Sequence, residues 1–206
     1  MRPILIFLLV AGAGIIIWLF VARPEEKVQP AKQQAIAVSK HSDSFNTGIS
    51  NVMAEYSRLA ESFVNWDSSQ SAATAANLVQ KFESLHLDEL QKDSSGIFET
   101  AAAFIENAKG DAGTIASEKG IRQQREAFNS LTDNYYQFLN TVKYDRQTLY
   151  LQECPMAFDD TKSALWISEK EQIRNPYLGL HHPTYGKGML SCGETKIKLD
   201  NTGAGK

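Results

Sequence analysis

IRQQREAFNSLTDNYYQFLNTV, residues 121–142, is the stretch of sequence that decides the fold class. Its large apolar residues recur at spacings of three, four or seven positions: Ile121, Phe128, Leu131, Tyr135, Phe138 and Val142. This spacing places them on one face of an α-helix, which turns once every 3.6 residues. Gly113 and Gly120 lie before the segment and interrupt the pattern, so the position at which the helix starts is left open.

Three earlier segments have the same helical period. One carries apolar residues from 45 to 63. The next begins after Asp67 or Ser68, carries apolar residues as far as Leu85 or Leu90, and is ended by Ser94, Ser95 and Gly96. The third carries apolar residues from 97 to 108 and stops at Lys109 and Gly110. Amphipathic segments joined by short polar breaks are typical of helix bundles. The sequence therefore predicts a mainly α protein, with an antiparallel four-helix bundle over residues 42–143 whose core is built from these apolar side chains.

The character of the sequence changes after residue 143. Residues 148–151 and 195–199 have the composition and alternation of short strands. The segment between them contains three prolines and several glycines, which favours an ordered but irregular loop. We therefore expect a small C-terminal β/loop appendage over residues 144–200, followed by a loose tail at 201–206.

Residues 4–21 form an uncharged apolar run of 18 residues, ILIFLLVAGAGIIIWLFV. As a helix the run would be about 27 Å long, close to the thickness of a bilayer core. Arg2 precedes it and the charges at 23–27 cancel, so the positive end should stay in the cytoplasm and the rest should be exported. The sequence favours an inner-membrane anchor within residues 1–22, with a cleaved signal peptide and a soluble periplasmic product as the alternative. Residues 23–41 would be a tether.

Residues 154–192 hold most of the soft ligand atoms of the chain: CPMAFDDTKSALWISEKEQIRNPYLGLHHPTYGKGMLSC. Cys154 and Met156 open this stretch, and Met189 and Cys192 close it. If the flanking strands pair, two thiolates and two thioethers converge, and such donors select Cu(I), with Ag(I) following the same logic. His181 and His182 are further candidate ligands, and a solvated loop is the other interpretation of them.

A disulfide between Cys154 and Cys192 is the competing interpretation. It would close a loop of 39 residues and contribute about 4 kcal/mol in the chain-entropy model. The two interpretations are compatible as redox alternatives at one site, because metal binding requires thiolates.

Other functional classes find little support in the sequence. A net charge of −3 argues against a nucleic-acid partner. A zinc hydrolase built on His181, His182 and Asp160 would lack the usual motifs, since the chain has neither a His-x-x-x-His pair nor a nucleophile elbow. We therefore expect no catalytic residues and no enzymatic activity.

The short motifs at 154–157, 165–168, 173–179 and 189–194 occur in an order that resembles a domain-of-unknown-function family. The family consists of Gram-negative periplasmic proteins, and its domain is also found attached to heavy-metal efflux adaptor proteins. The helical segment 122–131 resembles the same family, and the resemblance covers about residues 42–199. Residues 180–188, which contain both adjacent histidines, look like an insertion relative to the family.

The resemblance implies a helical bundle with a metal-handling appendage used in copper or silver resistance. Cys154, Met156, Met189 and Cys192 match its motif positions, whereas His181 and His182 do not. The expected function is a periplasmic protein that buffers Cu(I), or passes it to an efflux adaptor or another envelope protein. The alternative is a non-catalytic envelope interaction or structural module that carries the Cys154–Cys192 disulfide.

Overall fold

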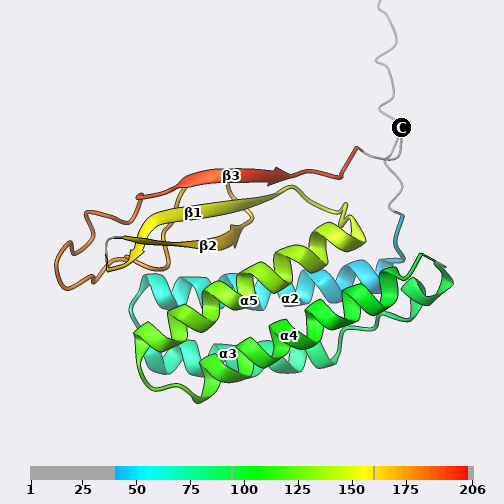
Figure 1. Cartoon of the computed structure of the whole chain (residues 1–206), viewed down its shortest axis with the longest axis horizontal. Helices are drawn as coiled ribbons and strands as arrows, with labels where there is room; N and C mark the ends of the chain where they lie inside the picture. Colours follow the sequence, from blue (N-terminus) through cyan, green and yellow to red (C-terminus); the bar gives the residue numbers. More distant parts are fainter. Residues whose placement is uncertain (1–39, 94, 160, 204–206) are drawn as a thin grey trace, which may run out of the picture. The chain divides into compact units, whose positions relative to one another are not determined.

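The computed structural model describes residues 40–93, 95–159 and 161–203, which all belong to one compact unit. The unit is mainly helical, with four α-helices followed by a small antiparallel sheet (Figure 1). The elements in chain order are α2 (Asp43–Val64), α3 (Ser68–Glu83), the short 3-10 helix η1 (Asp88–Lys92), α4 (Ile97–Ser117), α5 (Ile121–Val142), β1 (Leu149–Phe158), β2 (Lys162–Ser168) and β3 (Glu194–Leu199).

The expected anchor at 4–21 and nearly all of the tether at 23–41 lie outside the described residues, as does the end of the tail. Within the part of the chain that is described, none of the helices is long and apolar enough to cross a membrane.

Local capping explains where two of the helices begin. The Ser42 side chain accepts a hydrogen bond from the Phe45 backbone N–H (3.2 Å), and the Asp67 side chain accepts one from the Gln70 N–H (2.8 Å). Such caps satisfy backbone donors that have no partner within the helix. The second helix therefore begins after Asp67, one of the two starts that the sequence allowed. Its predicted extension to Leu85 or Leu90 was wrong, because α3 ends at Glu83 and Leu90 is buried from the separate 3-10 helix η1. Gly120 occupies the N-cap position of α5, so this helix begins at Ile121.

The predicted end of the third helix at Lys109 and Gly110 was wrong. Helix α4 continues through Gly110 and Gly113 to Ser117. Each glycine costs about 1 kcal/mol relative to alanine in a helix interior. The additional turns bury Ala112 and Ile115 completely, and this burial explains why tertiary packing overrides the local preference.

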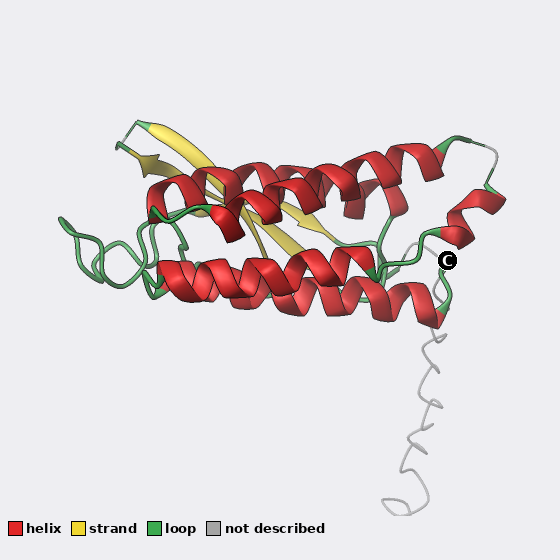
Figure 2. Ribbon diagram, turned by 90° about the horizontal axis from the view of Figure 1, so that it is seen from below, coloured by secondary structure: helices red, strands yellow, loops and turns green. Residues whose placement is uncertain are grey.

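The apolar faces of the helices form the core, as the sequence predicted. Helix α3 packs against α2 and α4, and α4 packs against α5. Figure 2 shows these helices from the side opposite the sheet. In α5 the predicted face is buried except for the half-buried Ile121. Aromatic rings join the helices, since the Phe128 ring centroid lies 5.1 Å from that of Tyr56 and 5.0 Å from that of Phe63.

The C-terminal sheet is larger than the sequence predicted. Its order is β2-β1-β3, with both pairings antiparallel. β1 extends to Phe158, and β2 occupies part of the segment that we expected to be an irregular loop. Pro155 does not prevent this, because it lies in the irregularity between Cys154 and Phe158, where the β1–β2 register shifts. A residue without a backbone N–H is tolerated at such a point.

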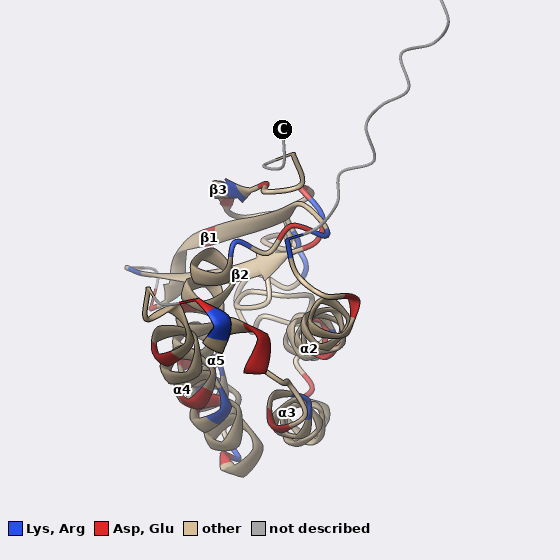
Figure 3. Cartoon of the chain, turned by 90° about the vertical axis from the view of Figure 1, so that its right-hand side faces the viewer, with Lys and Arg blue, Asp and Glu red and all other residues tan. Residues whose placement is uncertain are grey.

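Strand β2 attaches the sheet to the helices. Its backbone N–H groups at Leu165 and Ile167 donate to the side chains of Asn129 on α5 (2.8 Å) and Tyr56 on α2 (3.1 Å). In the end-on view of Figure 3, α2 and α5 lie between the sheet and the other two long helices. The outer edge of β2 is therefore capped by helix side chains, and buried residues of sheet and helices form one hydrophobic cluster.

The segment after β2 docks on the end of α2 through a close approach at Gly179. Leu180 N–H donates to the Val64 carbonyl (2.8 Å), and the Trp66 indole N–H donates to the Leu178 carbonyl (2.9 Å). A Cβ at Gly179 would lie 2.5 Å from the Val64 oxygen, and the backbone φ there is +57°. This position therefore accepts only glycine.

Replacing Gly179 with alanine should lower the free energy of unfolding by about 3 kcal/mol, through left-handed backbone strain and the clash with α2. Urea denaturation measures this change. Gly186→Ala is the matched control, because φ at Gly186 is +53° and nothing lies within 4 Å of the added carbon. It should cost only about 1 kcal/mol. Equal losses in the two variants would contradict the close approach on Val64.

Candidate metal centre at the cysteine pair

The pairing of β1 with β3 brings the two cysteines together. Gln152 pairs with Thr195 and Glu153 with Glu194, so Cys154 follows directly on β1 where Cys192 precedes β3. The Cys154 thiol lies within hydrogen-bonding reach of the Cys192 side chain, and both residues are free thiols in this structure. The flanking strands therefore do pair, which was the condition that the sequence set for the two ends of the loop to come together.

Cys154 is completely buried, and this burial raises the pKa of its thiol. Hydrogen bonds from the Asn175 side chain and the Met156 backbone N–H lower the pKa, whereas the neighbouring Cys192 raises it. Burial is the largest effect, because a thiolate in an apolar site loses its hydration. At neutral pH the free Cys154 is accordingly a thiol, and a bound cation would have to displace its proton.

Asn175 holds the two ends of the loop in place. It is completely buried, its Nδ2 donates to the Cys192 carbonyl (2.7 Å), and its backbone N–H donates to the Leu190 carbonyl (2.8 Å). Its Oδ1 accepts from the backbone N–H groups of Tyr177 (2.8 Å) and Leu178 (3.0 Å). The Asn175 side chain also lies close enough to the Cys154 thiol to lower its pKa, so this one side chain reaches both ends of the loop.

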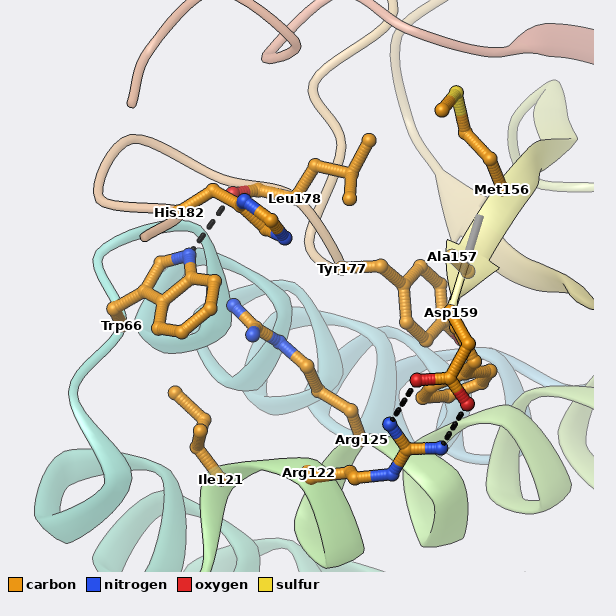
Figure 4. Close-up of a pocket in the computed structure, with 11 residues that line it drawn as sticks. Trp66, Ile121, Arg122, Arg125, Met156, Ala157, Asp159, Tyr177, Leu178 and His182 are labelled. Carbon is orange, nitrogen blue, oxygen red and sulfur yellow. Dashed lines mark hydrogen bonds and ion pairs between the residues drawn. The ribbon is translucent and has the colours of Figure 1, made fainter. Parts of the chain in front are cut away.

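The two methionines lie close to the cysteines along the chain, and both are half-buried against the core. Met189 begins a tight turn in which the Cys192 N–H donates to the Met189 carbonyl (3.0 Å). Met156 follows Cys154 on β1 and lines a neighbouring pocket (Figure 4). The structure thus places Met189 in the same turn as one thiol and Met156 two residues from the other.

The histidines are not part of the cysteine pair. His181 is exposed, whereas the ring of His182 stacks on Tyr185 (4.8 Å between centroids) and meets the edge of Trp66 (5.4 Å). His182 Nδ1 accepts from the backbone N–H of Thr184 (3.2 Å). His182 lines the same pocket as Met156, and neither cysteine does.

In residues 40–93, 95–159 and 161–203, no three side chains of His, Cys, Asp or Glu gather in a way that could hold a metal ion. That absence applies to those four residue types and does not include the thioethers of methionine. The donors that the structure brings together are therefore two thiols, with thioethers nearby in sequence. Asp160, named in the hydrolase hypothesis, lies outside the described residues.

Two residues that shape this site were not singled out from the sequence. Asn175 belongs to the Ile-Arg-Asn-Pro-Tyr motif, and an Asn before a Pro indicates only a turn. Gly193 has a φ of +135°, and a Cβ there would lie 2.6 Å from the Glu153 oxygen and 3.0 Å from the Trp166 ring. The buried Trp166 therefore packs beside the residue that follows Cys192, in addition to packing in the core.

Residues 52–147 match the family described as "Protein of unknown function (DUF3347)". The match includes most of α2, all of α3, α4 and α5, and ends before β1. It is shorter than the resemblance expected over about 42–199, and the motifs that contain the cysteines lie beyond it. No curated protein and no solved structure matches the chain. The similarity therefore concerns the helical part and leaves the function to be argued from the site.

Proposed function

We propose that this chain is a periplasmic copper-binding protein that holds Cu(I) between the thiolates of Cys154 and Cys192. Met156 and Met189 would add thioether ligands, and Ag(I) would bind in the same way. The observation that carries the proposal is the proximity of the two thiols where β1 meets the start of β3, close enough for each to influence the other electrostatically. Binding at this pair would let the protein buffer copper or pass it on.

The chemistry of the donors favours Cu(I) over other metals. Thiolate and thioether are soft donors that suit Cu(I), whereas structural zinc sites use four ligands drawn mainly from Cys and His. The described residues bring only two such ligands together here. Burial of Cys154 also limits access of water to one side of the bound ion. Cu(I) tolerates low coordination numbers, so ligand exchange with a partner is feasible.

The remaining parts of the proposal concern location and partner. The four helices would act as an antiparallel four-helix bundle that carries the cysteine site on the attached sheet. Residues 4–21 would anchor the chain in the inner membrane, or be cleaved as a signal peptide. A heavy-metal efflux adaptor, or another envelope protein, would receive the copper. The apolar run and the family resemblance support these parts.

A second candidate function rests on the same contact. Two thiols within reach of each other can also form a disulfide, which would fix the loop 154–192 permanently. The protein would then be a non-catalytic structural or interaction module of the envelope. The redox state of the pair in the isolated protein separates the two functions, because a disulfide offers no thiolate to a metal.

Cu(I) titration of the full-length chain, reduced and kept without oxygen, tests the proposal. A competing chelator sets the affinity scale, and one tightly bound equivalent is expected. Cys154→Ser should weaken binding by about 100-fold or more, because a thiolate is the main ligand. Met189→Leu should weaken it by about tenfold, and Met53→Leu should not change it. Met53 is buried in α2, so its replacement removes a thioether far from the cysteines in the sequence and serves as the control.

Binding that is no tighter than in the variant lacking both cysteines would reject the copper site. Thiols that do not react with an alkylating reagent until a reductant is added would support the disulfide module instead. If Met53→Leu lowers the Cu(I) affinity as much as Met189→Leu does, the thioethers are not ligands of the bound copper.

A further inference from the structure

A separate pocket lies between the start of α5, the end of β1 and the segment after β2 (Figure 4). Its volume is about 270 Å³. Much of its wall is apolar or aromatic, from Trp66, Ile121, Tyr177 and Leu178. Such a cavity is large enough for a small organic molecule, and the polar groups in its wall determine which kind.

Arg125 is the polar group that distinguishes this pocket. It projects from α5 on the apolar side of the helix, one turn before Phe128, and only 4% of its surface is exposed. Its guanidinium donates from Nε to the Pro176 carbonyl (2.9 Å) and from Nη2 to the Phe63 carbonyl (2.7 Å). One face stacks over the Trp66 ring at 4.0 Å. The guanidinium is therefore held rigidly in the pocket wall.

No carboxylate balances this buried charge among the residues that the structure describes. The ion pairs there include neighbouring Arg122, whose two terminal nitrogens donate to both oxygens of Asp159 (2.7 Å each), and none includes Arg125. Its two acceptors are carbonyls, whereas a guanidinium carries five N–H donors. Burial lowers the pKa of Arg125 to about 9, so it remains charged at neutral pH. A buried charge without an opposite charge is costly.

We propose that this pocket binds a small organic monocarboxylate, with its carboxylate on the guanidinium of Arg125 and its apolar body against Ile121 and Leu178. Arg122 and Asp159 neutralise each other, so the pocket offers one net positive charge, which suits a monoanion. His182 Nδ1 accepts backbone hydrogen bonds and so does not act as a donor to the ligand from that atom. Planar guanidinium and carboxylate groups match in geometry, and the apolar wall favours a carboxylate with a hydrocarbon body over inorganic phosphate.

Calorimetric titration of the full-length chain in mild detergent, reduced and free of metal, tests this site with benzoate as the probe. Benzoate should bind with a Kd of about 1 mM or tighter, and its neutral analogue benzamide at least about tenfold more weakly. Arg125→Met should weaken benzoate binding to the level of benzamide. Arg146→Met is the matched control, because Arg146 pairs with the exposed Asp43.

Ala157→Phe provides a test that leaves Arg125 in place, since Ala157 is half-buried in the pocket wall and a larger side chain would fill the space. It should abolish benzoate binding even if the Arg125 variant fails to fold. Equal binding of benzoate and benzamide, tighter binding of inorganic phosphate than of benzoate, or full benzoate binding in the Ala157 variant would each overturn the proposal. Because no metal is present, the result is independent of the proposed copper function.

Discussion

Replacing Asn175 with alanine is expected to lower the free energy of unfolding by about 3 kcal/mol, because buried hydrogen-bonding groups left without partners each cost 1 kcal/mol or more. The variant removes the acceptor for the Tyr177 and Leu178 N–H groups and the donor for the Cys192 carbonyl. The affinity for Cu(I) should fall by about tenfold or more, as for other residues that orient metal ligands. Urea denaturation of the metal-free chain and chelator competition measure the two effects.

Asn201→Ala is the matched control for this variant. Asn201 is half-buried and its Nδ2 donates to a single acceptor, the Tyr144 carbonyl (3.1 Å), away from the cysteines. Asn201→Ala should lower the free energy of unfolding by at most about 1 kcal/mol and leave the Cu(I) affinity unchanged. An Asn175 variant that binds Cu(I) as tightly as the original chain would show that Asn175 supports the loop without positioning the cysteines.

Replacing Phe128 with alanine should cost about 4 kcal/mol of unfolding free energy, because it leaves a cavity at a fully buried aromatic position. The Phe128 ring lies 6.0 Å from that of Tyr177, in the segment after β2, as well as near the rings of α2. Helix and sheet should therefore lose stability together. Far-UV circular dichroism and tryptophan fluorescence, followed in one urea titration, should show coincident transitions.

Phe98→Ala makes the same substitution at a half-buried position of α4. This variant should lower the free energy of unfolding by only about 1–2 kcal/mol, since the neighbouring solvent can fill part of the space. Two separate transitions in the Phe128 variant, with the sheet melting apart from the helices, would contradict a shared core.

The helices could be predicted from the sequence because their stabilising pattern is local. The apolar residues of α5 recur at spacings of three, four or seven positions, and all those that the sequence placed on one helical face lie within Ile121–Val142, although the start of the helix was left open. The end of α4 could not be predicted from its glycines, because the burial of Ile115 depends on a neighbouring helix. β2 was missed for a similar reason, since its N–H groups are satisfied by Asn129 and Tyr56, which lie far away in sequence.

The candidate site was predictable only in outline. The meeting of Cys154 and Cys192 follows from two short strands that the alternation of residues indicated. The role of Asn175 could not be predicted, because its side chain meets three separate backbone groups only once the loop has folded. Arg125 did leave a signal, because a charged residue one turn before Phe128 on an apolar helix face must find a partner or a pocket. Its stacking on Trp66 could not be predicted, because it depends on where the chain turns after the end of α2.

The order of the strands has a consequence for how the protein folds. Helices α2 to α5 follow one another along the chain and pack mostly against their neighbours in sequence, and such local contacts are made quickly. Leu149 pairs with Leu199 only after a long loop has closed, which is slow because of its entropic cost. The two thiols should therefore meet late, after the helical part is in place. During that interval both sulfur atoms should be accessible to oxidants and metal ions, and the folding rate of the sheet should determine how long this exposure lasts.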